Sequence, residues 1–472
     1  MVVGSRTSQD AIQQCLGNFP FKFALGQRYV GGFLGDTALK EGWIREQVDV
    51  LVRGVKALAH AARRYPQAAY AGLVRCYQPK WNYLQRVCGS DGKLFQPLEE
   101  ALAEDFLPAL FQQQYQDITH LRKLLALPVR HGGLGIRDPT ATAVGNHQAS
   151  VDGTKQLVEA LLSNSPLDIG EYHMAASSTK AKLRAARDKA DKLVLQASLA
   201  ATANPVTKRV VKRAGFTGAW LTVIPSRVNG TELTADEFRD PLNVRYNLRP
   251  PHTPKRCDGC GKPFTLAHAF TCPKGGLPIL RHDLVKKEWN SLCSQAISSS
   301  KVFDEPPIHT GRADLDEPAL NAGERSQERG DIGVVGFWKQ RRMCIFDVRV
   351  THLEISSNMK YTVQTALKIP ENEKKARYLE ACEAMRRDFV PLVFSADGMF
   401  SPATLAAVKR LSQLLSEKWE APFSVCCGYV RSRLSLCLAR SLTMCLRDPR
   451  TLTSTQPEIP VTTAAGLQAM SN

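Results

Sequence analysis

The sequence predicts an α+β fold in which a helical N-terminal half is followed by a small Cys/His module and a compact α/β domain. Three patterns support this prediction. Apolar residues recur at 3.6-residue spacing between residues 37 and 127, which favours helices. Three cysteines and a histidine cluster at 257–272. The segments 329–352 and 389–394 are apolar and β-branched, which predicts strands of a mixed sheet of roughly four to five strands.

The charge of the chain indicates its class of partner. The 472 residues carry a net charge of +17, which favours a polyanionic partner, nucleic acid before membrane. No run of about 18 apolar residues occurs, so we expect no membrane-spanning helix, and no secretory signal is evident. The thirteen cysteines are odd in number and scattered, which suits a reducing compartment and a metal site better than a disulfide framework.

The N-terminal half is expected to begin with short strands and to continue as packed helices. Glycine turns punctuate residues 19–36, which predicts short strands there. Four prolines interrupt the helical stretch 37–127, so we expect several helices rather than one; these are Pro66, Pro79, Pro97 and Pro108. A glycine-rich loop at 131–135 closes this part.

A basic helical region is predicted at 177–213. Ten basic residues there are accompanied only by Asp188 and Asp191, and we expect this surface to contact phosphate groups. The simpler alternative is an ordinary solvated surface. The candidate nucleic-acid-binding residues are Lys180, Lys182, Arg184, Arg187, Lys208, Arg209, Lys212 and Arg213, with Arg349 further along the chain.

The clearest metal-binding motif consists of Cys257, Cys260, His268 and Cys272. Its spacing, Cys-x2-Cys-x7-His-x3-Cys, begins with a glycine-containing turn that can place two thiolates on one metal. His268 and Cys272 are four residues apart, which fits one face of a helical turn. The motif therefore predicts a structural Zn²⁺ site.

Two alternatives accompany the zinc prediction. The four residues could be unrelated, with the thiols buried as small apolar groups. His282 could replace Cys272 as a ligand, or it could orient one. Because such a short segment is not expected to bury a core of its own, we predict that the metal supplies most of its folding energy.

Two aspartates lie in the strand region downstream. Asp331 precedes a short apolar run, and Asp347 interrupts the apolar run 343–350. A carboxylate within an apolar strand is unfavourable unless it binds a cation or a strong partner. Two carboxylates on neighbouring strands can hold Mg²⁺ against a phosphate, which predicts metal-dependent cleavage of a nucleic-acid backbone. The alternative is a pair of ordinary strand-end aspartates.

The rest of the chain is expected to complete this domain. We expect a loop at 301–328, a charged helix from Glu371 to Arg387, and helices at 402–419 and 424–446. Lys374 and Lys375, near the start of the charged helix, could point back at the two aspartates. Arg349, two residues after Asp347, should share its strand face.

In this order, the motifs resemble those of one family. The Cys/His motif is followed by Arg-Gly-Asp at 329–331, Phe-Asp-Val-Arg-Val at 346–350 and Glu-Lys-Lys-Ala-Arg-Tyr at 373–378. The chain resembles the C-terminal part of non-LTR retrotransposon reverse transcriptase polyproteins that carry a restriction-like endonuclease. Upstream, residues 127–135 resemble the thumb of these reverse transcriptases, and 28–35 resemble the primer-grip strand pair that ends the palm.

The resemblance implies a domain order and a set of roles. It implies Asp331 and Asp347 as Mg²⁺ ligands of a PD-(D/E)xK-type nuclease, with Lys374 or Lys375 as the catalytic cation. The implied parts are a palm remnant with primer-grip-like strands (1–40), a thumb-like helical domain (41–150), a basic helical linker (151–242), a zinc-knuckle region (243–300), the endonuclease domain (301–447) and a disordered tail (448–472).

The resemblance also implies an activity and partners. We expect nicking of target DNA to prime reverse transcription, with DNA and element RNA as partners, in the nucleus and without a membrane. Two positions depart from the family pattern. Gly330 replaces a proline, and Arg349 replaces a lysine and cannot lose a proton to act as a base. The chain contains no Asp-Asp dipeptide, so no stand-alone polymerase activity is expected.

Two other classes of function compete with the endonuclease. One is a nucleic-acid-binding remnant of a retroelement without turnover. The other is a structural helical scaffold, which predicts no salt-dependent DNA binding.

Overall fold

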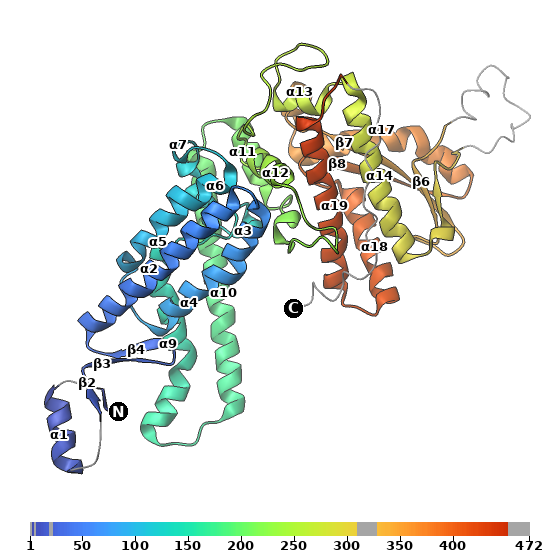
Figure 1. The fold of residues 1–472 in the computed structure, drawn as a ribbon. Coiled ribbons are helices and arrows are strands. Elements are labelled where there is room, and N and C mark those ends of the chain that lie inside the picture. Colours follow the sequence, from blue (N-terminus) through green and yellow to red (C-terminus); the bar gives the residue numbers. More distant parts are fainter. Residues whose placement is uncertain (1, 4–5, 18–21, 309–327, 452–472) are drawn as a thin grey trace, which may run out of the picture. The chain divides into compact units, whose positions relative to one another are not determined.

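The protein folds as two compact units, each with its own core. The structure is a computed structural model and describes residues 2–3, 6–17, 22–308 and 328–451 (Figure 1). The units meet in the sequence between Ala201 and Thr202. The fold is mixed and mostly helical, which confirms the predicted α+β class at this coarse level. No helix among the described residues is long and apolar enough to cross a membrane.

The first unit is helical apart from two small pairs of strands. β1 (Val2–Val3) pairs with β2 (Phe23–Ala24), and β3 (Gly26–Tyr29) forms an antiparallel hairpin with β4 (Gly32–Gly35). The helices are α1 (Arg6–Leu16), α2 (Thr37–Ala62), α3 (Pro66–Gly72), α4 (Gln78–Val87), α5 (Gln96–Glu100), α6 (Leu107–Phe111), α7 (Tyr115–Ile118), α8 (Arg122–Ala126), α9 (Pro139–Ser163) and α10 (Ile169–Ala201).

The prolines of this unit occur at two kinds of position. Pro66 and Pro97 lie in the first turns of α3 and α5, where a missing N–H group has no helical acceptor. Pro79 and Pro108 follow the π-helical segments Leu73–Tyr77 and Ala101–Phe106, which join α3 to α4 and α5 to α6. Large side chains from this region are fully buried and form the core of the unit, among them Trp81, Phe95, Phe106 and Phe111.

The second unit contains a four-stranded sheet with helices on both faces. The strands are β5 (Val302–Asp304), β6 (Ile332–Val335), β7 (Met343–Thr351) and β8 (Asp388–Ser395). Their order is β5-β6-β7-β8, with β7 and β8 parallel and the other pairs antiparallel, which confirms the predicted mixed sheet. The helices are α11 (Pro205–Ala214), α12 (Ala235–Val244), α13 (Leu266–Thr271), α14 (Leu277–Ala296), α16 (Ser356–Met359), α17 (Val363–Ala384), α18 (Pro402–Trp419) and α19 (Phe423–Arg447).

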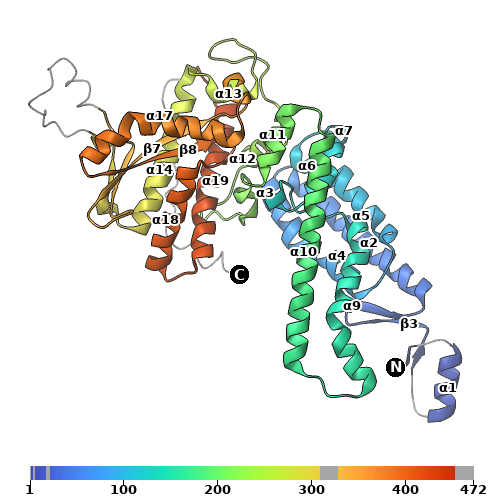
Figure 2. The same ribbon diagram turned by 180° about the vertical axis from the view of Figure 1, so that it is seen from behind.

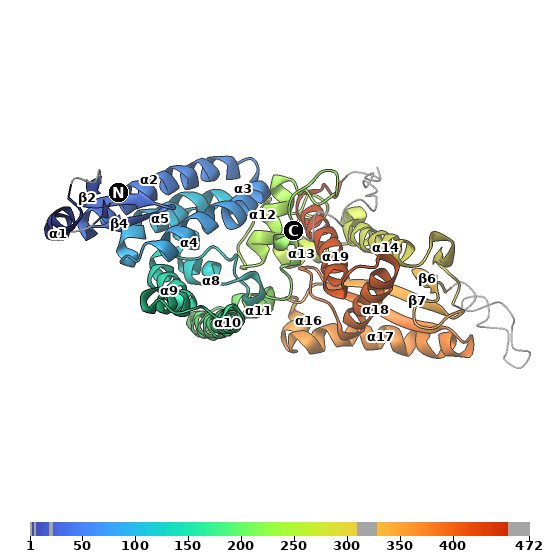
Figure 3. The same cartoon turned by 90° about the horizontal axis from the view of Figure 1, so that it is seen from below.

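Alternation along β7 builds two cores. Phe346 and Val348 pack with Trp289 of α14 and with α18 and α19, whereas Ile345 packs with Tyr378 of α17. Figure 1 shows α14 and α19 over one face of the sheet, and Figure 2 shows α17 over the other. Figure 3 shows the sheet between α14 and α17. Asp347 lies two residues after Ile345 on β7, so the two side chains point to the same face of the sheet, the face that α17 covers.

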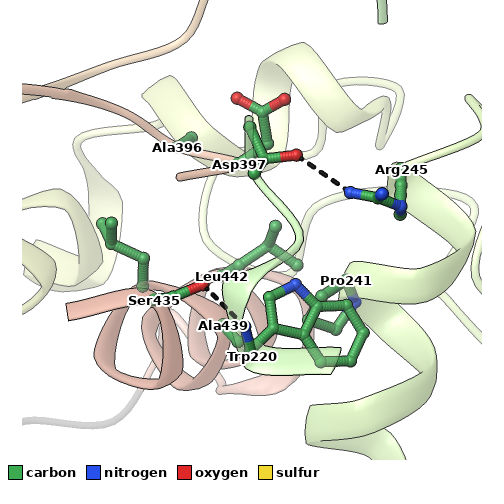
Figure 4. A pocket seen from close by; sticks show the side chains of 10 residues that line it. Trp220, Pro241, Arg245, Ala396, Asp397, Ser435, Ala439 and Leu442 are labelled. Carbon is green, nitrogen blue, oxygen red and sulfur yellow. Dashed lines mark hydrogen bonds between the residues drawn. The ribbon is translucent and has the colours of Figure 1, made fainter. Parts of the chain in front are cut away.

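The segment that precedes the zinc motif packs against the C-terminal helix. Trp220 is buried, contacts Phe238 edge-to-face at 5.2 Å between ring centroids, and donates a backbone hydrogen bond to Ser435 Oγ of α19 (3.2 Å). Figure 4 shows Trp220 with Pro241 and Leu442 around it.

The cavity next to Trp220 measures about 10 Å³. That is the space of a single water molecule, so we assign no ligand to it.

Four sequence predictions about elements were wrong in detail. The basic region is not one helix, because Asn204 caps and Pro205 begins a new helix, α11, in the second unit. The charged helix begins at Val363 rather than Glu371, since Thr362 caps it. The expected loop 301–328 contains the edge strand β5, and its residues 309–327 lie outside the described residues. The predicted disordered tail 448–472 begins too early, because Arg450 is buried and its guanidinium donates to Cys445 O (2.6 Å). The rest of that tail, from 452 onwards, lies outside the described residues.

Candidate functional site

The four residues of the zinc motif converge, as predicted. A short hairpin brings Cys257 and Cys260 together, since the Cys257 backbone N–H donates to Lys262 O (2.9 Å). Helix α13 then supplies His268, and its C-cap is Cys272. The ligand atoms of these four residues all lie within 4.8 Å of one another. Among the residues that the structure describes, this is the only group of three or more His, Cys, Asp or Glu side chains gathered so closely.

The geometry of this cluster fits a tetrahedral Zn²⁺ ion. Cys272 Sγ lies 3.9 Å from Cys257 Sγ and from Cys260 Sγ. An ion bound at the usual Zn–S distance separates two sulfurs by about 3.8 Å. The Cys260 Sγ to His268 Nε2 distance is 3.3 Å. Hydrogen bonding from the Lys262 backbone lowers the pKa of the Cys260 thiol, which favours the thiolate that binds metal. The Cys₃His cluster can therefore hold zinc.

The zinc module, residues 257–272, shares a hydrophobic core with α19, whereas the prediction that the metal supplies most of its folding energy stays a prediction. Phe264 and Phe270 are buried together with Leu442 and Cys445 of α19. The end of that helix is also attached to the module, since the Arg450 backbone N–H donates to Asp258 and its guanidinium donates to Ala269 O (3.1 Å). Tertiary packing therefore supplies the core that the short segment lacks by itself.

The two predicted acidic residues lie next to each other at the end of β6. The Asp331 backbone N–H donates to Phe346 O (3.0 Å), and Asp331 Oδ2 accepts a hydrogen bond from the Val348 N–H (2.6 Å). Asp331 thus contacts the residues on both sides of Asp347. Standard bond lengths then place Asp331 Oδ2 no more than about 5.5 Å from the Asp347 Cα. Asp331 is therefore hydrogen-bonded to the segment of β7 that carries Asp347.

Each of the two carboxylates has a cationic partner from a different helix. Lys374 Nζ of α17 lies 2.7 Å from Asp347 Oδ2. Asp347 is 5% exposed, and among the described residues no well-aligned hydrogen bond reaches its buried Oδ2. His282 of α14 places Nε2 3.0 Å from Asp331 Oδ2. His282 is therefore not a zinc ligand, which corrects the alternative considered from the sequence.

The two lysines that the sequence left as equal candidates differ in position. Lys374 contacts Asp347, whereas Lys375 forms an ion pair with Glu371 one turn earlier (2.8 Å). Arg349 forms an exposed ion pair with Glu373 (3.1 Å). We call Asp331 and Asp347 the acidic pair, and Lys374 is the lysine that contacts it.

Burial and charge act in opposite directions on these groups. Burial raises the pKa of Asp347, and the Lys374 ion pair opposes that rise. Burial acts likewise on Asp331, but the hydrogen bond and charge of His282 lower its pKa overall. The hydrogen bond to Asp331 raises the pKa of His282 to about 9. These shifts favour the ionised carboxylate of Asp331 and the protonated imidazole of His282.

The predicted nucleic-acid-binding residues divide into exposed and buried groups. Arg213 is 4% exposed and binds Glu354 (2.8 Å) and Asp397 (2.6 Å), so the prediction that it contacts nucleic acid is wrong. Arg209 donates to Tyr361 O (2.5 Å) and is largely covered. The exposed members are Lys180, Lys182, Arg184 and Arg187 on α10, Lys208 and Lys212 on α11, and Arg349 on β7.

Sequence reasoning missed the role of α14 at the acidic pair. His282 lies 49 residues before its partner Asp331, and no local pattern links the two. Lys286, one turn later, binds Asp304 and Glu305 (both 2.9 Å). The one available signal was that His282 and Lys286 are four residues apart and so share a helix face.

Comparison with known proteins does not identify the chain. No protein-family model matches it, and no curated protein matches it.

Proposed function

We propose that this chain is the metal-dependent DNA endonuclease portion of a retrotransposon polyprotein. The observation that carries the proposal is the contact of Asp331 with both neighbours of Asp347, with the Lys374 amine 2.7 Å from the second carboxylate. Two adjacent carboxylates and a lysine are the groups that phosphodiester hydrolysis with a hard cation requires.

The acidic pair fits a magnesium ion of the kind that nucleases use. Asp331 and Asp347 supply two carboxylates, and the remaining ligands would be water and phosphate oxygens, as Mg²⁺ prefers. When bound there, Mg²⁺ would polarise the phosphate and lower the pKa of the attacking water. Lys374 stabilises the negative charge that develops on the phosphate. Arg349 contributes positive charge but does not act as a base.

The other parts of the chain support a role with nucleic acid. The zinc module and the exposed basic residues of α10 and α11 hold DNA or element RNA through backbone charge. The order of the motifs resembles that of non-LTR retrotransposon polyproteins. In such an element, the chain nicks a nuclear DNA target, and the free 3′ end of the nick then primes reverse transcription.

The proposal is tested by nicking of supercoiled plasmid with the zinc-loaded chain and Mg²⁺. We expect nicking that disappears in Asp347→Asn, while filter binding to DNA is retained. Lys374→Ala should lower the nicking rate by about 10²-fold, the size of effect seen when one charge-stabilising group is removed. Lys375→Ala is the matched control and should nick at nearly the normal rate, because its amine pairs with Glu371.

The outcomes separate the endonuclease from its alternatives. Nicking that persists in Asp347→Asn would assign the activity to another site or another protein. Salt-dependent DNA binding without any Mg²⁺-dependent nicking would instead support the nucleic-acid-binding remnant. Absence of both would leave the helical scaffold.

A further inference from the structure

His282 lies where it can control the carboxylate of Asp331. Asp331 Oδ2 accepts two hydrogen bonds, from His282 Nε2 (3.0 Å) and from the Val348 backbone N–H (2.6 Å). Among the described residues, neither donor engages the other carboxylate oxygen, Oδ1. With one oxygen held by two donors, the carboxylate cannot rotate freely, and Oδ1 is the oxygen left to bind a cation.

His282 is itself held in place. Its other ring nitrogen, Nδ1, lies 3.1 Å from Asp283 Oδ1. Its helix is anchored to the sheet because Val285 and Trp289, three and seven residues later on the same face, are fully buried in the core. A group on a rigid helix with a fixed ring orientation can position a ligand more accurately than a loop residue can.

We infer that His282 is a positioning residue, which orients Asp331 for binding of the divalent cation through an Asp283–His282–Asp331 hydrogen-bond chain. This inference rests on the proposed function and adds a residue to it. Outer partners that orient metal ligands typically change metal affinity by about 10–100-fold when removed. His282 should therefore act on metal affinity more than on the maximal rate.

The experiment compares His282→Leu with His282→Gln in the zinc-loaded full chain. Leucine fills similar space without a donor, whereas the glutamine amide can replace the Nε2 donor. We expect His282→Leu to raise the half-saturating Mg²⁺ concentration for nicking about tenfold or more, with the maximal rate largely retained. His282→Gln should restore most of the Mg²⁺ affinity. Binding of Mn²⁺, followed by electron paramagnetic resonance without DNA, should show the same order.

Three controls make the result decisive. His60→Leu changes an exposed histidine on α2 and should leave the Mg²⁺ dependence unchanged. Asp283→Ala should give a smaller shift in the same direction as His282→Leu. Asp331→Ala and Asp347→Asn test the proposed function itself, because both should abolish nicking and weaken Mn²⁺ binding.

The failure of this inference is distinguishable from failure of the proposed function. If Asp347→Asn abolishes nicking but His282→Leu changes only the maximal rate or only the melting temperature, the positioning role is overturned and the endonuclease stands. If neither aspartate variant affects nicking or Mn²⁺ binding, the endonuclease proposal fails, and the positioning role fails with it.

Discussion

At the scale of single residues, buried charges carry most of the information in this protein. Asp347 is 5% exposed in an apolar strand, and the Lys374 amine at 2.7 Å compensates its burial. Arg213 is equally buried and is compensated by Glu354 and Asp397. The first group belongs to the proposed cation site, whereas the second is paired within the protein. Burial alone therefore does not distinguish a functional charge from a structural one.

His352 gives a prediction for the pH dependence of stability. Burial lowers its pKa to about 4, and the Phe270 ring lies 5.0 Å away, centroid to centroid. Because this folded-state pKa lies below the unfolded value of about 6.5, stability is fully present above pH 6.5 and is lost as the pH falls towards 4. The slope of unfolding free energy against pH is set by the number of protons that the protein takes up on unfolding. In His352→Leu this number should fall by up to about one over that pH range, so the unfolding free energy should decrease less steeply.

Urea unfolding at pH 7, 5.5 and 4.5 measures this effect. The carboxylates near His352 titrate in both proteins, so the difference in slope between wild type and variant isolates the histidine. Identical slopes would show that His352 has the same pKa in the folded and the unfolded state, and would contradict the burial effect.

At the scale of elements, the zinc module and the end of α19 form one structural piece. Arg450 donates to Ala269 O of the module and to Cys445 O of α19, and its guanidinium lies 5.1 Å from the Phe264 ring centroid. The Cβ that a side chain would add at Gly259 or Gly275 would meet Arg450 within 3 Å. A change in the module is therefore expected to reach the C-terminal helix.

Metal removal tests this coupling. Cys260→Ser, or chelation of zinc, should lower the melting temperature and increase hydrogen exchange at 257–272 and at 444–450 together, because both segments share one core. Cys76→Ser is the matched control, since that thiol is exposed in the first unit. Faster exchange confined to 257–260 would contradict the coupling.

At the scale of the whole molecule, the chain divides into two units with separate cores. The zinc cluster, the acidic pair, Lys374 and His282 all belong to the second unit, which begins at Thr202. Because contacts within each unit account for its packing, a fragment of residues 202–451 should fold cooperatively by itself.

The fragment prediction has two measurements. Thermal unfolding of the zinc-loaded fragment should be a single transition, and plasmid nicking should persist and still require Asp347. Affinity for DNA should be lower and less dependent on salt than in the full chain, because the fragment lacks the basic residues of α10. A fragment that unfolds without a cooperative transition would show that the second unit needs the first.

Several elements were predictable because their signals are local. Pro66 and Pro97 mark helix beginnings by the absence of an N–H group, and the Cys/His spacing requires its own turn and helix. The helices at 402–419 and 424–446 were predicted to within one residue of α18 and α19 at each end. The break at Pro205 was also visible, but basic charge on both sides of it concealed the division between units.

By itself, the sequence determined the α+β class, the zinc ligands and the two aspartates as candidates, since spacing and local chemistry suffice for these. Only the tertiary structure decided that Lys374 rather than Lys375 meets Asp347, that His282 belongs to Asp331, and that Arg213 is internal. These outcomes depend on which helix face packs on which side of the sheet. That is a property of long-range packing, and residues far apart in the chain carry no local record of it.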